Sequence, residues 1–253
     1  LWHTLSLHDA LPISSHPGNI GATARAMKNM GLGRLSLVTP RHFPHAEATA
    51  RASGADDLLA KAEVFDSLEA ALAGHVLAFA TTARARRLEW PLLDPRQAAA
   101  EIDRESETGP VALVFGREQT GLSNEEVALT QRAIRIPTAE DYASLNLAQA
   151  VQVVSYEIGY LVHAPGADRP VSQTPKAAAD RPATAEEVTD LGAHLERAMV
   201  RVSYLDPERP KLMRRRLARL GARAGLLRSE VQILRGFLTR VEERIPGHEN
   251  EEN

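Results

Sequence analysis

Three short polar segments contain the residues best suited to bind a ligand or catalyse a reaction. The first covers residues 15–25, and its glycines allow a ligand to approach the backbone closely. It leads into a helix whose free N–H groups can bind an anion, and Arg25 lies about two turns inside that helix. The same pattern also fits an N-capped helix that carries an ordinary surface arginine. This segment alone therefore leaves both interpretations open.

The second segment, residues 115–126, follows a continuous apolar run that is typical of a strand buried on both faces. Gly116 comes directly after that strand, which indicates backbone packed against a ligand. Arg117 and Glu118 would then lie at the rim of the sheet. The segment lacks the Gly-Lys-Ser/Thr sequence of a phosphate-binding loop, and the chain has no GxGxxG dinucleotide fingerprint. By itself, the segment is a weak glycine-loop signal.

The third segment, residues 136–149, places Ser144 and Asn146 at the start of a very apolar helix. Asn146 can cap that helix, which is the purely structural interpretation. In the functional interpretation, this segment closes a pocket together with the second segment.

Other kinds of chemistry lack the residues they need. The chain has no cysteine, which excludes a disulfide scaffold, a thiolate zinc site and a cysteine nucleophile and fits a cytoplasmic protein. The nine histidines show no metal-binding spacing, so we expect no metal. There is no G-x-S-x-G elbow, and only 4% of residues are aromatic, which argues against a stacking platform for single-stranded nucleic acid. No apolar run is long enough to predict a membrane span.

The elements that must position these segments alternate between helix and strand from residue 15 to residue 163. Such alternation predicts a parallel sheet covered by helices on both faces, and chain rules alone would favour a doubly wound sheet. Strands are predicted at residues 34–39, 75–82, 111–115 and 133–136. Helices are predicted at residues 19–30, 46–53, 67–73, 95–102 and 145–162, and a further helix is capped by Ser123 with Glu126.

Composition divides the chain into five parts. Residues 1–14 show no clean period and no signal-peptide pattern. We interpret them as an atypical leader that does not belong to the rest of the chain, and the alternative is a strand or helix without a recognisable pattern. Residues 15–163 form the α/β domain. Residues 164–182 contain four prolines and read as a linker. Residues 183–246 show only helical periods and form a small, partly basic domain, and residues 247–253 are a polar tail.

The formal net charge of −3 hides a basic cluster. Eight arginines and lysines fall between Arg209 and Arg228, with no acidic residue among them. Such a cluster can neutralise phosphates and gain affinity for a nucleic acid by releasing counterions. The alternative is a solvated helix face whose charge is compensated by Glu186, Glu187 and Glu196.

Taken together, the three polar segments resemble the three signature motifs of the SPOUT methyltransferases, RNA-methylating enzymes with an α/β-knot fold. Residues 15–31 resemble the first motif, residues 114–125 the second and residues 136–148 the third. Their order, and their spacing over about 130 residues, argue against a chance match. The helical C-terminal extension further resembles the members that methylate the 2′-hydroxyl of cytidine or uridine 32 in the tRNA anticodon loop.

The resemblance implies a parallel sheet with a C-terminal trefoil knot, a homodimer, a tRNA substrate and S-adenosylmethionine as the methyl donor. It implies catalytic or supporting roles for Asn19, Arg25, Glu118 and Ser144. It implies cofactor-binding roles for Thr81, Thr82, Ala83, Gly116, Ile136, Ser144, Leu145 and Asn146. We add phosphate contacts to the RNA at Arg84, Arg86, Lys211, Arg214, Arg215 and Arg216.

Two alternatives remain open. A SPOUT enzyme could act on ribosomal RNA or on the tRNA wobble nucleotide, and a non-catalytic RNA-binding protein could retain the fold. The long helical extension favours methylation of nucleotide 32 over methylation of the wobble nucleotide. The chain also departs from the family, because residues 1–14 stand where a hydrophobic first strand should lie. We therefore expect that strand to be missing. If it is, a neighbouring strand loses backbone hydrogen-bond partners, and cofactor binding would be weakened even with all three motifs intact.

Overall fold

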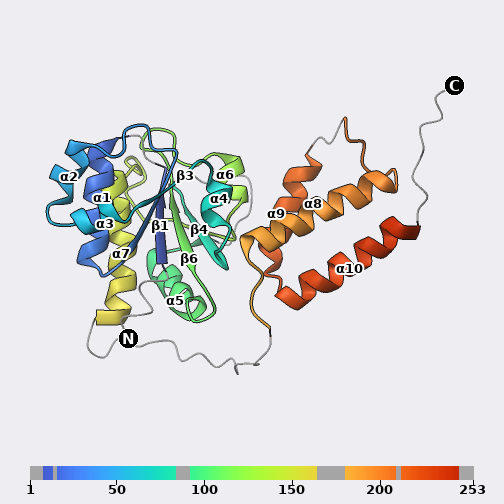
Figure 1. Cartoon of the computed structure of the whole chain (residues 1–253). Coiled ribbons are helices and arrows are strands. Elements are labelled where there is room, and N and C mark those ends of the chain that lie inside the picture. Colours follow the sequence, from blue (N-terminus) through green and yellow to red (C-terminus); the bar gives the residue numbers. More distant parts are fainter. Residues whose placement is uncertain (1–7, 14–15, 84–91, 164–179, 209–211, 245–253) are drawn as a thin grey trace. The chain divides into compact units, whose positions relative to one another are not determined.

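The computed structural model describes residues 8–13, 16–83, 92–163, 180–208 and 212–244. The chain divides into two compact units, Leu1–Lys176 and Ala177–Asn253. The first unit is an α/β domain and the second is helical (Figure 1). Within the described ranges, no helix is both long and apolar enough to cross a membrane.

Among the described residues, a parallel sheet of seven strands forms the centre of the first unit, in the order β3-β2-β1-β6-β4-β7-β5. Every strand pair in it is parallel. The strands are β1 (His8–Pro12), β2 (Arg34–Val38), β3 (Glu63–Phe65), β4 (Leu77–Thr81), β5 (Leu92–Leu93), β6 (Val111–Phe115) and β7 (Arg132–Ile134). The trefoil knot that the resemblance implies stays a prediction.

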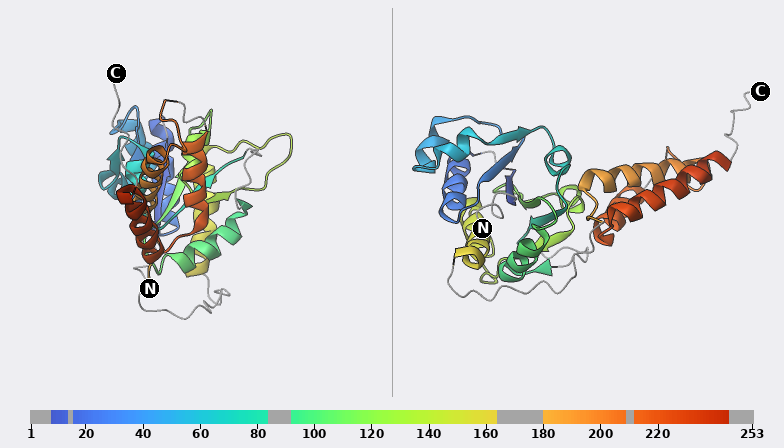
Figure 2. Two further views of the ribbon diagram at one scale, coloured as in Figure 1. Left: turned by 90° about the vertical axis from the view of Figure 1, so that its right-hand side faces the viewer. Right: turned by 60° about the horizontal axis from the view of Figure 1, so that its bottom comes forward.

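Helices cover both faces of this sheet (Figures 1 and 2). Helices α1, α2, α3 and α7 lie on one side, α4 and α6 lie on the other, and α5 packs against α7. The helices of this unit are α1 (Pro17–Asn29), α2 (Ala46–Ala52), α3 (Asp56–Ala60), α4 (Leu68–Leu72), α5 (Pro95–Glu105), α6 (Asn124–Ala128) and α7 (Leu147–His163). The capping box predicted for Ser123 and Glu126 is present at the start of α6.

The expectation of a missing first strand is wrong. Residues 8–12 form β1, which lies between β2 and β6 inside the sheet. The pairing with β6 runs from His8 opposite Val111 to Pro12 opposite Phe115. Both neighbours supply a ladder of backbone hydrogen-bonding groups, and this non-local pairing overrides the weak strand propensity of the sequence His-Asp-Ala-Leu-Pro.

Close packing between α1 and α2 depends on small residues. Gly21 is buried in α1, and a Cβ atom there would lie 2.0 Å from the backbone oxygen of Ala48 in α2. Ala24 and Ala52, on the same two helices, are fully buried in the core. The two helices can therefore approach each other only while position 21 carries no side chain.

We expect Gly21→Ala to destabilise the first unit by about 3 kcal/mol, since relief of this overlap requires the backbone to move. Gly33→Ala is the matched control, because a Cβ at Gly33 would meet nothing within 4 Å. The control should change the free energy of unfolding by less than about 1 kcal/mol. Urea unfolding followed by circular dichroism measures both values, and equal stabilities for the two variants would contradict the prediction.

In the part of the second unit that the structure describes, the helices are α8 (Ala185–Arg201), α9 (Met213–Ala224) and α10 (Arg228–Arg244). Thr184 caps α8 through a capping box with Glu187, as the sequence predicts. A hydrogen bond from Arg181 lowers the pKa of Glu187 and fixes the start of this helix. The apolar core of the unit consists of Ala183, Leu191, Ala198, Val231 and Leu238.

Candidate active site

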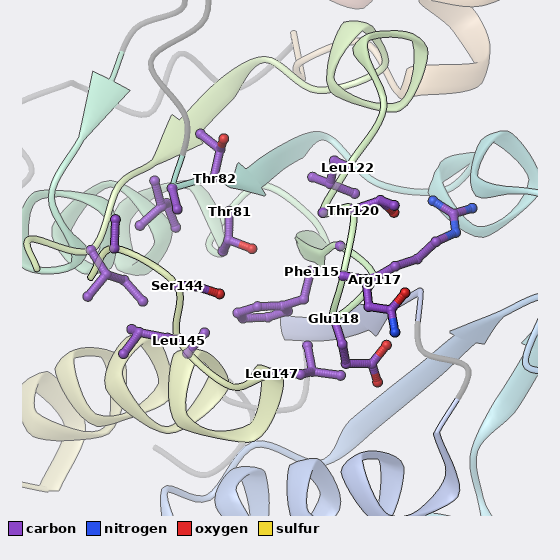
Figure 3. Close-up of a pocket in the computed structure, with 18 residues that line it drawn as sticks. Thr81, Thr82, Phe115, Arg117, Glu118, Thr120, Leu122, Ser144, Leu145 and Leu147 are labelled. Atoms are coloured by element: carbon purple, nitrogen blue, oxygen red, sulfur yellow. The ribbon is translucent and has the colours of Figure 1, made fainter. Parts of the chain in front are cut away.

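A cavity of about 410 Å³ lies at the carboxyl ends of β4, β6 and β7. This edge is where open parallel sheets bind their ligands. Segments from all three strand ends and from the loop before α7 line the cavity, which combines hydroxyl groups with an apolar floor (Figure 3). The lining residues are Thr81–Ala83, Phe115–Leu122, Ile134, Ile136, Ala143–Leu145, Leu147 and Ala150.

Gly116 determines the shape of one wall of this cavity. A Cβ atom at this position would lie 2.3 Å from the carbonyl carbon of Gly121 and 2.4 Å from the backbone nitrogen of Leu122. The loop closes on itself through two backbone hydrogen bonds between Arg117 and Gly121, of 2.8 and 3.3 Å. Gly121 has a φ of 67°, a conformation that favours glycine. The wall is therefore a tight backbone turn that leaves no room for a side chain at position 116.

A chain of side-chain hydrogen bonds connects the three polar segments. The Nδ2 atom of Asn19 donates to the Oε1 atom of Glu118 over 2.9 Å. The Nδ2 atom of Asn146 donates to the Oδ1 atom of Asn19 over 3.1 Å. Asn146 also caps α7, because its Oδ1 atom accepts from the backbone N–H of Ala148 over 2.9 Å. The structural and the functional interpretations of Asn146 therefore both apply.

The structure brings most of the predicted cofactor-binding residues to one place. Seven of the eight line the cavity, and Asn146 lies in the chain between Leu145 and Leu147, which both line it. The seven are Thr81, Thr82, Ala83, Gly116, Ile136, Ser144 and Leu145. In Figure 3, Thr81, Phe115 and Ser144 approach the same hollow from separate segments of the chain.

Sequence reasoning missed the apolar floor of the cavity. Phe115, Ile134 and Leu147 are buried and line it, and each is the last or first residue of its strand or helix. The one feature of the sequence that could have identified them is their position next to the polar segments. From sequence alone, an apolar side chain at the end of a strand is assigned to the core. Only the fold shows that the cavity opens beside these side chains.

The predicted catalytic arginine lies apart from this cavity. Arg25 is exposed on α1 and does not line the cavity. Its side chain makes no hydrogen bond or ion pair with any residue in the described ranges. The guanidinium group is therefore available to a ligand that reaches the surface of α1.

The basic cluster forms helix α9 and its flanks, and part of its charge is compensated within the second unit. The Nε atom of Arg214 lies 2.7 Å from the Oε1 atom of Glu196, and Arg228 lies 3.6 Å from Glu187. Arg216 is exposed. The compensated-face interpretation therefore holds for Arg214 and Arg228. Three predicted RNA contacts, Arg84, Arg86 and Lys211, lie outside the described residues.

No group of three potential metal ligands occurs among the histidines and carboxylates that the structure describes. The cavity instead offers hydroxyl groups, backbone groups and apolar surface, and its volume lies in the range typical of small-molecule sites. This set of groups suits a ligand of the size and mixed polarity of a nucleoside.

Comparisons with known proteins agree with this architecture. Residues 11–156 match the SpoU rRNA Methylase family, and residues 186–250 match the C-terminal domain of the tRNA methyltransferase TrmJ. The chain is 46% identical over 233 residues to the tRNA (cytidine/uridine/adenosine-2′-O-)-methyltransferase TrmJ of Pseudomonas aeruginosa, which covers 90% of this chain and 91% of that protein.

Two further relatives extend this agreement. The TrmJ of Sodalis glossinidius, a tRNA (cytidine/uridine-2′-O-)-methyltransferase, is 42% identical over 90% of this chain and 88% of its own length. Among solved structures, TrmJ from Z. mobilis ZM4 superposes with a TM-score of 0.79 at 35% identity, over 93% of this chain and 98% of that one.

Proposed function

The chain belongs to the SpoU rRNA methylase family and carries a TrmJ C-terminal domain, and from this we propose that it methylates the 2′-hydroxyl of nucleotide 32 in the tRNA anticodon loop. It is an RNA ribose 2′-O-methyltransferase that depends on S-adenosylmethionine. The observation that carries the proposal is the cavity at the sheet edge, whose lining residue Glu118 is joined through Asn19 to Asn146, so that hydrogen bonds connect all three motif segments.

The residues of the cavity fit this cofactor. Gly116 allows the loop to fold tightly against its own backbone and so form one wall of the cavity. Phe115, Ile134 and Leu147 provide an apolar surface for a purine ring. The hydroxyl groups of Thr82 and Ser144 can bind its polar groups. When bound, S-adenosylmethionine supplies an electrophilic methyl group on a sulfonium, which calls for neither a metal nor a covalent nucleophile.

The protein must align the ribose hydroxyl with the methyl group and stabilise the charge that develops as the proton leaves. Arginine stays protonated in proteins, so Arg25 is poorly suited to act as a base. We infer that Arg25 orients the phosphate of the target nucleotide and stabilises the developing alkoxide, with that phosphate as the proton acceptor. Its exposure on α1 makes it accessible to RNA.

We further infer a homodimer in which α7 contributes to the interface. Val153, Tyr156 and Tyr160 lie on one face of α7 and are 36%, 49% and 48% exposed. The two tyrosine rings lie 6.1 Å apart. Such a continuous apolar face is typical of an interaction surface, and α7 begins directly after Asn146 of the third motif. Sedimentation should show a dimer for the native chain and a monomer for Tyr156→Glu with Tyr160→Glu, and a native monomer would exclude this inference.

The deciding experiment is methyl transfer to a panel of purified tRNAs, followed by mapping of the modified nucleotide. We expect methylation at position 32. Modification at the wobble nucleotide or in ribosomal RNA would favour the alternative substrates, and absence of S-adenosylmethionine binding by calorimetry would favour a non-catalytic protein. The panel should include adenosine at position 32, because the Pseudomonas relative is named for three bases. From the tRNA substrate we also infer a location in the cytoplasm.

We also propose that α9 binds the tRNA backbone. Reversing Arg214, Arg215 and Arg216 to glutamate should weaken tRNA binding and flatten its salt dependence. Because Arg214 pairs with Glu196, its reversal also brings two carboxylates together. The cleaner comparison is Arg216→Glu against Arg235→Glu, a reversal at an exposed position of α10. Filter binding over a salt series measures both, and equal affinities would contradict a role for α9.

A further inference from the structure

A second cavity of about 670 Å³ lies next to the cofactor cavity in the first unit. It opens where β1 and β2 end and where α1 begins. The two cavities share residues 117–120 of the second motif, so this one loop forms part of the wall of both. The polar groups that line the second cavity include those of His16, Asn19, Thr39, Arg41, Arg117 and Glu118.

Most charged groups of the second cavity already have partners within the protein. Arg117 donates two hydrogen bonds to the carboxylate of Glu126, of 2.9 and 3.1 Å. Glu118 accepts from Asn19. Arg41 differs, because it is exposed and makes no hydrogen bond or ion pair with the residues that the structure describes. Arg41 is therefore the cation of this cavity that is available to an incoming anion.

The start of α1 does not compete with Arg41 for an anion. The backbone N–H of Gly18 donates to the Nδ1 atom of His16 over 3.1 Å, and the N–H groups of Asn19 and Ile20 donate to the backbone oxygen of His16. The first amides of the helix are thus capped by the protein itself. A negatively charged ligand in the second cavity would meet the Arg41 side chain.

The backbone that carries Arg41 is strained. Thr39, at the end of β2, has a φ of 46°, in the left-handed region that β-branched residues rarely adopt. A hydrogen bond from its N–H to the backbone oxygen of Phe65 holds it there over 2.9 Å. Residues in such conformations concentrate at ligand sites, where the surrounding structure maintains the strain. Here the strained turn leads the chain from the sheet to Arg41 at the second cavity.

We propose that Arg41 binds a phosphate of the RNA backbone beside the ribose that is methylated, and that the second cavity holds this sugar-phosphate segment. The shared wall places such a segment next to the cofactor cavity, which the transfer requires. Arginine forms strong, bidentate hydrogen bonds with phosphate oxygens. This inference rests on the proposed function, because it assumes an RNA substrate.

The test compares Arg41→Ala and Arg41→Lys with Arg51→Ala, which removes an exposed arginine from α2 that does not line either cavity. Binding of an unmodified tRNA transcript is measured by fluorescence anisotropy over a potassium chloride series. We expect Arg41→Ala to weaken binding about tenfold and to reduce the slope of log K against log salt by about 1. Arg41→Lys should retain the slope, because the positive charge remains, and Arg51→Ala should behave as the native protein.

Cofactor binding and turnover separate this contact from general damage. The affinity for S-adenosylmethionine, measured by calorimetry, should be unchanged in Arg41→Ala, and KM for tRNA should rise while kcat stays within about threefold. Native affinity and salt slope in Arg41→Ala, or an equal loss in Arg51→Ala, would overturn the inference. If the native protein binds tRNA through Arg41 but transfers no methyl group, the proposed function fails while the contact stands.

Discussion

Replacement of Gly116 by alanine should weaken S-adenosylmethionine binding at least 100-fold, which corresponds to about 2.7 kcal/mol. The added Cβ atom would overlap backbone atoms of Gly121 and Leu122, and these atoms have no flexible side chain that could move away. The turn at residues 117–121 must open, and it carries one wall of the cofactor cavity. Isothermal calorimetry measures the affinity directly.

Gly74→Ala is the matched control, since a Cβ at Gly74 would meet nothing within 4 Å. It should bind the cofactor with native affinity. The melting temperature of Gly116→Ala must be measured beside the affinity, because an altered turn also lowers stability. A folded Gly116→Ala variant that binds within threefold of the native protein would show that the cavity does not depend on this close approach.

The second large effect is expected at Arg25. Arg25→Ala should lower kcat for methyl transfer to tRNA by about 10²–10³, the loss that follows removal of one group that stabilises developing charge. Arg25→Lys should lower kcat by at least about tenfold, because an ammonium group cannot reproduce a bidentate contact with phosphate. Single-turnover kinetics with saturating tRNA measures this step.

The control variant for Arg25 is again Arg51→Ala, which removes another exposed arginine. Affinity for S-adenosylmethionine should be native in all three variants, since Arg25 does not line the cofactor cavity. Near-native turnover in both Arg25 variants would exclude the role proposed for this residue. A loss of cofactor binding would instead place Arg25 in the methyl-donor site.

Sequence patterns predicted the elements whose signal is local. The buried strand at residues 111–115 agrees with β6, and the capping boxes at Ser123 and Thr184 mark the starts of α6 and α8. The elements that were missed are short or depend on distant partners. β5 has two residues and β3 has three, and β1 is held by its pairing with β2 and β6.

The candidate site shows the same limit. The three motif segments were found from their residue types, and the sequence correctly placed two of them after apolar strands. The sequence contained no indication that Asn19 forms hydrogen bonds with Glu118 and Asn146, which lie 99 and 127 positions further along the chain. Nor could it reveal the second cavity, because Thr39 is an unremarkable residue until its backbone conformation is known. Contacts between distant loops arise only from the packing of the sheet.

The loop shared by the two cavities has a thermodynamic consequence. If occupation of the cofactor cavity shifts residues 117–120 and so changes the affinity of the second cavity, then occupation of the second cavity changes cofactor affinity by the same factor. This reciprocity holds whichever ligand arrives first. Titrating the cofactor with and without RNA therefore measures how strongly the enzyme couples its two substrates before any chemistry takes place.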